Sequence, residues 1–129
     1  MNSKIKKIYN ELAKDYNRLI DHKPHNAYYD RPNMFDLLGN VAGKYILDAA
    51  CGPGKYAEIL LSKNATVLGL DISEEMVRYA RQRTKGAALF YVHDLQKPLT
   101  MCESGTFDVV LCALAMHYIK DWNATLKEF

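Results

Sequence analysis

Three aspartates and two closely spaced glycines are the residues whose positions suggest chemistry. Asp48 follows the apolar run Tyr45-Ile46-Leu47, and the segment Gly52-Pro53-Gly54 comes shortly after it. Asp71 and Asp94 each follow a later apolar run. Parallel strands end along one rim of an open sheet, and ligands bind at that rim. The sequence therefore predicts a binding rim that carries three carboxylates.

Spacing and backbone freedom both indicate a nucleotide-like ligand. Gly52 and Gly54 have no Cβ, so the backbone can turn sharply and a flat ligand can approach the next helix. Asp71 lies 19 residues after Gly52 (71 − 52), close to the offset of about 20 residues at which an acid meets a ribose in a βαβ unit. Taken separately, the glycines also fit a plain strand-to-helix turn, and Asp71 also fits a turn before the helix cap Ser73.

The hydrophobic pattern predicts the elements that position these residues. Four apolar runs have the length and composition of buried strands, at 44–50, 65–70, 87–92 and 107–111. Helices are expected between the first three, the second of them capped by Ser73, and a last helix over about 121–129. Strands that alternate with helices form a parallel sheet with right-handed crossovers. We therefore predict a Rossmann-like open α/β fold.

Two helices are expected ahead of the first strand. The first is amphipathic and ends before Pro24, with an apolar face of the kind that covers a core, made of Ile5, Ile8, Tyr9, Leu12, Tyr16, Leu19 and Ile20. The second should begin near Pro32 and close between Gly39 and Gly43. We therefore predict one domain, with a helical cap at 1–43 and a cofactor-binding core at 44–129.

Composition limits the class of protein. The chain has 129 residues, of which 49% are hydrophobic and 25% charged, with a net charge of +2. These values fit one globular domain and give no sign of a nucleic-acid or membrane surface. Because the sequence has neither a membrane-spanning stretch nor a signal peptide, we expect a cytoplasmic protein. The cysteine spacing indicates no zinc site, and His22 and His25 are expected in a surface loop rather than at a metal.

Three motifs together resemble class I S-adenosylmethionine-dependent methyltransferases. Residues 46–54 resemble the first motif of that family, residues 68–76 its second-strand motif and residues 107–112 its fourth-strand motif. The likeness covers nearly the whole chain and is greatest to the small-molecule branch called type 11, or ubiquinone/menaquinone-biosynthesis-like. It implies an enzyme that transfers a methyl group from S-adenosylmethionine to a small-molecule acceptor by in-line displacement.

By matching position, this resemblance also implies site residues. The methionine part of the cofactor would lie along the first motif, at Asp48, Ala50, Gly52 and Gly54. Asp71 would hold the ribose, and the adenine would lie among Ile72, Met76, Asp94 and the backbone of Leu95. The Cys112 backbone would lie near the sulfonium. Further positions could cover the site or pair with the cofactor's carboxylate, namely Tyr16, Tyr29 and Arg31. His117 is placed to act as a general base, with a packed helix histidine as the alternative.

The chain departs from the family pattern in two places. Ala50 stands where many members have a glycine, and we expect its methyl group to be tolerated. The chain also ends in the helix after the fourth strand. We therefore expect cofactor binding without turnover, and a homodimer formed through the exposed edge of that strand.

Two other functions are alternatives to the methyltransferase. One is a non-catalytic S-adenosylmethionine-binding module, and the other is an NAD(P)-binding Rossmann domain, since residues 52–57 satisfy the loose G-x-G-x-x-(G/A) pattern. Against a dinucleotide, Pro53 removes a backbone donor from the expected pyrophosphate site. Asp48 would repel a pyrophosphate, whereas it suits an ammonium and a sulfonium.

Overall fold

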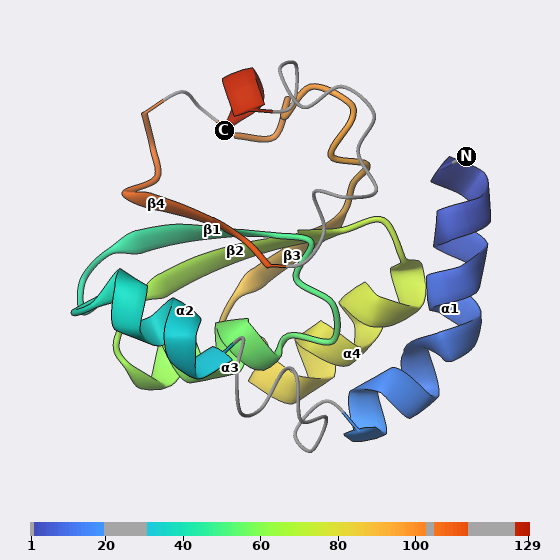
Figure 1. Cartoon of the computed structure of the whole chain (residues 1–129), viewed down its shortest axis with the longest axis horizontal. Coiled ribbons are helices and arrows are strands. Elements are labelled where there is room, and N and C mark those ends of the chain that lie inside the picture. The colour runs from blue at the N-terminus through green and yellow to red at the C-terminus, as the bar shows by residue number, and fades with distance from the viewer. Residues whose placement is uncertain (1, 20–30, 103–104, 114–125) are drawn as a thin grey trace.

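Four parallel strands form the centre of the fold (Figure 1). The computed structural model describes residues 2–19, 31–102, 105–113 and 126–129. The strands are β1 (Tyr45–Ala49), β2 (Thr66–Asp71), β3 (Leu89–Val92) and β4 (Val109–Cys112), and the sheet order is β3-β2-β1-β4. The chain therefore adds β2 and β3 on one side of β1 and β4 on the other. Ligands bind beyond the carboxyl ends of strands at such a switch in order.

The predicted parallel α/β fold is confirmed. Crossover helices α3 (Lys55–Ser62) and α4 (Glu74–Thr84) connect β1 to β2 and β2 to β3. Ser73 caps α4 as expected, because its side chain accepts a hydrogen bond from the Met76 N–H. Of the expected last helix, residues 126–128 are helical, and the rest lies outside the described residues.

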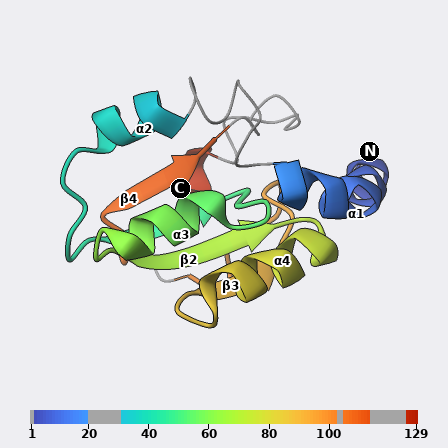
Figure 2. The same cartoon turned by 90° about the horizontal axis from the view of Figure 1, so that it is seen from below.

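Strands β1 and β2 are buried on both faces, as their continuous apolar runs predicted, whereas Leu89 and Tyr91 of the edge strand β3 are exposed. Alternate residues of a strand point to opposite faces. On one face, strand residues such as Ile46 and Val67 pack with α3 and α4, which lie together on the same side of the sheet in Figure 2. On the other face, Leu47 and Leu68 pack with Leu99 and with partly buried residues that include Leu95, Phe107 and Phe129.

The fourth strand begins two residues later than expected, and just before it a side chain takes part in the pairing with β1. The Tyr45 N–H donates to the Asp108 carboxylate at 2.8 Å, and the Asp108 N–H donates to the Tyr45 carbonyl at 2.8 Å. The Phe107 ring lies edge-on to that of Tyr45, with 4.7 Å between the ring centroids. The Asp108 carboxylate therefore bonds toward β1.

The two N-terminal helices pack against different elements. Helix α1 (Asn2–Leu19) packs beside α4, whereas α2 (Arg31–Leu38) packs on the helical face of the sheet (Figures 1 and 2). In α2, Met34, Phe35 and Leu38 contact the core, and the Phe35 ring lies 5.5 Å from that of Tyr56.

The apolar face predicted for α1 packs only in part, since Tyr9 and Tyr16 are half-buried. Ile8, Leu12 and Leu19 are 42%, 51% and 43% exposed, whereas Ala13 is buried. At the two ends of α4, Ser73 and Arg83 donate hydrogen bonds to Asn10 and Asn17 of α1. The expected helix is confirmed, but the expectation that the three exposed apolar residues cover the core is wrong.

One strand glycine is required by packing. A Cβ at Gly69 in β2 would clash with the Phe90 ring, so only glycine fits opposite this ring.

Among the helices of the described ranges, none has the length and apolar character needed to cross a bilayer.

Candidate cofactor site

The residues predicted at the binding rim lie together at the carboxyl ends of the strands. In the sheet register, Asp48 lies beside Gly69 of β2 and Leu111 of β4, and Asp71 lies beside Val92 of β3. The loop 50–54 and the turn after Asp71 begin here. The aspartates predicted at the ends of β1 and β2 therefore lie at the same rim of the sheet, as expected.

Asp48 is a buried acid that lacks a complete set of partners. Its side chain is 1% exposed, and its Oδ2 atom has no hydrogen-bond partner among the described residues. Burial, and secondly the nearby Asp71 carboxylate, raise the pKa of Asp48 to about 8. A buried carboxyl group in this state is stabilised by a ligand that brings a cation or a hydrogen-bond donor.

Asp71 has the opposite surroundings, since both of its oxygens accept hydrogen bonds from the backbone. Gly52 N–H donates to Oδ2 and Ser73 N–H donates to Oδ1, each at 2.9 Å. Burial raises the pKa of Asp71, and these two hydrogen bonds oppose that rise. Asp71 therefore ties the loop after β1 to the turn after β2. The bond to Ser73 fits the turn that the sequence offered as an alternative role for Asp71, whereas the bond to Gly52 was not predicted.

The loop after β1 is held in left-handed backbone conformations. Its φ angles are +63° at Ala50, +55° at Gly52 and +89° at Gly54. The expectation that the methyl group of Ala50 is tolerated took no account of this backbone conformation. Its left-handed backbone is strained for a residue that carries a Cβ.

The two glycines of this loop have different surroundings. A Cβ added at Gly52 would meet no atom within 4 Å, so this position is open to a ligand. A Cβ at Gly54 would lie 2.9 Å from the Ala80 Cα of α4. Gly54 therefore allows the loop to pack closely on α4, a contact that the sequence did not indicate.

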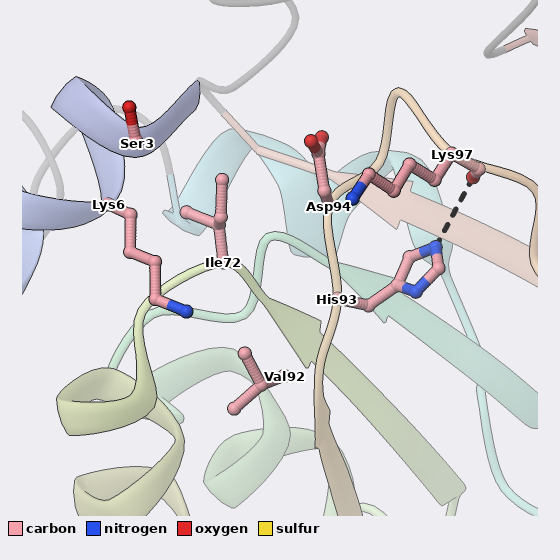
Figure 3. A pocket seen from close by; sticks show the side chains of 7 residues that line it. All are labelled: Ser3, Lys6, Ile72, Val92, His93, Asp94 and Lys97. Carbon is pink, nitrogen blue, oxygen red and sulfur yellow. Dashed lines mark hydrogen bonds between the residues drawn. The ribbon is translucent and has the colours of Figure 1, made fainter. Parts of the chain in front are cut away.

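A pocket of about 360 Å³ lies beside the ends of β2 and β3 (Figure 3). Ile72 follows β2, and Asp94 belongs to the segment after β3. The other lining residues are Ser3 and Lys6 of α1, and Val92, His93 and Lys97. The Asp94 carboxylate accepts from the Gln96 N–H at 2.9 Å. The structure thus brings together Ile72 and Asp94, two of the residues expected around an adenine.

Comparison with known proteins identifies the family. Residues 46–129 match the model of the methyltransferase domain family. The chain belongs to this methyltransferase family.

Named relatives agree with this assignment. The chain is 30% identical to a demethylmenaquinone methyltransferase of Lactococcus lactis over 97% of its length and 52% of the relative. It is 31% identical to a ubiquinone biosynthesis O-methyltransferase of Pseudomonas paraeruginosa over 87% of its length and 50% of the relative. The chain thus spans about half the length of these curated relatives.

Solved structures share the fold. An S-adenosylmethionine-dependent methyltransferase from Mesorhizobium loti superposes with a TM-score of 0.67 at 30% identity, over 79% of this chain and 44% of the other. Magnesium protoporphyrin IX methyltransferase from Synechocystis, solved with bound S-adenosylmethionine, gives a TM-score of 0.73 at 22% identity, over 98% and 69%. The family assignment does not favour the dinucleotide alternative.

Other predicted site residues of the methyltransferase domain differ in their placement. Met76 is 1% exposed, and it does not line the pocket of Figure 3. The expected contact of Met76 with an adenine stays a prediction. Leu95 is partly buried and packs on the sheet. Cys112 lies beside Ala49 at the end of β4, and burial and then Asp48 raise its pKa to about 11.

The site roles of the remaining positions stay predictions. Tyr16 is half-buried on α1. Arg31 begins α2, but its side chain lies outside the described part of the chain, as do Tyr29, His117 and the histidines at 22 and 25. Within the described ranges, no cluster of three or more histidine, cysteine or acidic side chains could hold a metal ion.

Two polar residues near the site were missed by sequence reasoning. Asn10 of α1 accepts a hydrogen bond from the Ser73 hydroxyl and lies 3.3 Å from the Glu75 N–H, which also donates to it. Arg83 of α4 donates to the carbonyl of Pro53. The available signal was the polar stripe of α1, where Asn10 and Asn17 are seven residues apart and share a helix face.

Proposed function

We propose that this chain binds S-adenosylmethionine at the carboxyl ends of its strands and belongs to an enzyme that methylates a small molecule. One observation carries the proposal: the buried Asp48 has an oxygen with no partner among the described residues, and the loop that follows is open at Gly52. A dinucleotide would bring a pyrophosphate toward this acid, whereas the amino group of S-adenosylmethionine brings a cation that the acid can pair with.

The other residues of the rim fit the remaining parts of the cofactor. A carboxylate has about four lone-pair sites, so Asp71 can accept from ribose hydroxyls while it keeps both backbone hydrogen bonds. Ile72 and Asp94 line one pocket and would bind the adenine through an apolar contact and a hydrogen bond. When bound, the cofactor supplies an activated methyl group on a sulfonium, and the protein's contribution is to bind and orient it.

A small-molecule acceptor is part of the proposal. The two relatives named for menaquinone and ubiquinone biosynthesis support this class of acceptor. A cytoplasmic location stays a prediction of the sequence, as do the absence of a nucleic-acid partner and the lack of turnover by this chain.

Titration calorimetry tests the proposed cofactor directly. We expect S-adenosylmethionine and its demethylated product to bind, and NAD and NADP to give no heat. The matched control is Asp48→Asn, which keeps the size of the side chain but removes its charge, and should weaken binding of both ligands. Tighter binding of NAD than of S-adenosylmethionine would refute the proposal.

A homodimer through β4 is a further part of the proposal. Within the described residues β4 is an edge of the sheet, and Val109–Cys112 carries no charged side chain. The carboxylate of Asp108 bonds toward β1, so it does not block the outer edge of β4. An edge of this kind can pair with a second strand. Light scattering over a concentration series should show dimers, and a strict monomer at high micromolar concentration would contradict this.

A further inference from the structure

Arg83 connects three elements that surround the loop after β1. It lies in the last turn of α4, and its side chain is 14% exposed. Its Nε donates to the Pro53 carbonyl at 3.2 Å. Its Nη2 donates to the Asn17 side-chain oxygen at 2.8 Å and to the Asn17 carbonyl at 3.2 Å, and its Nη1 lies 3.6 Å from a Glu58 carboxylate oxygen.

The contact with Pro53 fixes the middle of the cofactor loop. Pro53 stands between Gly52, whose N–H bonds to Asp71, and Gly54, which packs on Ala80. Ala80 and Arg83 are three residues apart and therefore share one face of α4. The loop thus contacts α4 at two adjacent points, one made by close packing and one by a charge-assisted hydrogen bond.

The guanidinium group suits this task better than an ammonium would. Its planar fork holds several donors in fixed directions, so one side chain can bond to Pro53 and Asn17 at once. A lysine has a compact charge on a flexible stem and cannot reproduce both directions. Asn17 belongs to α1, and its two oxygens set the orientation of the fork.

We propose that Arg83 is a positioning residue for the cofactor loop, and that Asn17 of α1 orients it. Arg83 holds the Pro53 carbonyl so that the Gly52 N–H meets Asp71 and the open side of Gly52 is presented to the ligand. This inference rests on the proposed function, because it assigns the loop to S-adenosylmethionine.

Arg78 is a matched control in the same helix. It has the same charge, but its side chain is 49% exposed. It bonds to Glu75 and stacks over Tyr79, both of which are residues of α4. Substitution of Arg78 therefore changes the charge of α4 without touching the loop.

The test compares Arg83→Gln, Arg83→Lys and Arg78→Gln by calorimetry with S-adenosylhomocysteine and by the amide NMR shifts of Gly52 and Gly54. We expect Arg83→Gln to weaken binding by about tenfold, as for the loss of a hydrogen bond to a charged group, and to shift both glycine amides in the free protein. Arg83→Lys should recover part of the affinity, and Arg78→Gln should bind within about twofold of the wild type.

Each outcome decides the inference. Wild-type affinity and unchanged glycine shifts in a folded Arg83→Gln protein would overturn it. If Arg83→Gln does not fold, Arg83→Lys takes its place, with weaker binding and shifted glycine amides expected and wild-type values contradicting the proposal. If the wild type binds no S-adenosylhomocysteine, the proposed function fails, whereas the glycine shifts still test whether Arg83 positions the loop.

Discussion

The ends of β1 and β2 lie side by side on the sheet and carry the same residue type in opposite surroundings. At the end of β2, Asp71 accepts two backbone hydrogen bonds, and the next helix is capped by Ser73. At the end of β1, Asp48 is buried, and one of its oxygens has no partner in the part of the chain that the structure describes. The loop that follows begins with Ala50 in a left-handed conformation.

This difference indicates at which strand end the carboxylate has all its hydrogen-bond partners without a ligand. The backbone of the protein donates the hydrogen bonds to Asp71, so the carboxylate at this end of the sheet is satisfied without a ligand. A buried oxygen without a partner and a strained backbone both lower stability, and such features concentrate at binding sites. The end of β1 is therefore the part of the rim that a ligand should stabilise most.

The largest effect on affinity is expected for Asp71→Ala, because this change removes a ribose acceptor and releases the loop after β1. Hydrogen bonds to a charged group contribute about 1.5–3 kcal/mol, so binding of S-adenosylhomocysteine should weaken by roughly 10- to 100-fold. Calorimetry provides the affinity, and urea unfolding should show a lower free energy of unfolding.

Asp71→Asn serves as the control for this substitution. Its amide oxygen can keep one of the two backbone hydrogen bonds, so its loss of stability should be smaller than that of Asp71→Ala. If Asp71→Ala binds within about twofold of the wild type while folded, the ribose assignment is wrong.

A smaller effect, with a pH signature, is expected for Asp48→Asn. Because the pKa of Asp48 is about 8 in the free protein, this acid is protonated at pH 6 and must ionise to pair with a bound ammonium. Binding should therefore release a proton, and the affinity of the wild type should rise between pH 6 and 7.5 by up to about tenfold per pH unit. Calorimetry in buffers of different ionisation enthalpy counts the proton.

Two controls sharpen this result. Asp48→Asn should bind about tenfold more weakly at pH 7.5 and show a flatter pH dependence. Methylthioadenosine, which has no amino-acid portion, should release no proton from the wild type. A wild-type affinity that does not change with pH would show that Asp48 does not pair with the amino group.

The same acid predicts how stability depends on pH. In the unfolded chain Asp48 loses its proton near its ordinary pKa of 3.8, whereas in the folded protein its pKa is about 8. Between these values the folded state binds more protons, so the free energy of unfolding should fall as the pH rises from about 4 to about 8. The raised pKa of Asp71 acts in the same direction. Asp48→Asn should reduce this slope in thermal unfolding, and an unchanged slope would contradict the assignment.

A third and weaker effect on affinity is expected for Asp94→Ala, because its carboxylate would accept one hydrogen bond from the adenine amino group. A loss of about 1 kcal/mol corresponds to roughly fivefold weaker binding. The matching ligand is S-inosylhomocysteine, in which an oxygen replaces this amino group. Asp94→Ala should bind the two ligands with similar affinity. If the variant prefers the adenine ligand as strongly as the wild type does, Asp94 does not bind the adenine.

The smallest effect is expected for Ala50→Gly, which relieves the left-handed backbone at the end of β1. Relief of about 1–2 kcal/mol is partly offset by the greater freedom of glycine in the unfolded chain. The free energy of unfolding should therefore rise by about 0.5–1 kcal/mol, with little change in affinity. Ala49→Gly is the control, because Ala49 lies in the strand and a glycine there should destabilise. A destabilised Ala50→Gly protein would show that the strain is absent.

The sequence by itself determined the parallel sheet, the cap at Ser73 and the aspartates at the strand ends. These features depend on local patterns, since apolar runs specify buried strands and the residue after a strand stands at the rim. The resemblance of three local motifs was likewise sufficient for the family that the comparisons then showed.

The tertiary structure alone decided how those residues are satisfied. Asp71 meets Gly52 across 19 residues of sequence, and Arg83 meets Asn17 across 66. The helical period of α1 predicted its apolar residues, but the packing of α1 beside α4 leaves Ile8, Leu12 and Leu19 exposed. Hydrogen-bond partners that are distant in sequence are fixed by how the elements pack, and local periodicity does not specify them. For the same reason, the sequence does not show that both oxygens of Asp71 are hydrogen-bonded, whereas one oxygen of Asp48 has no partner among the described residues.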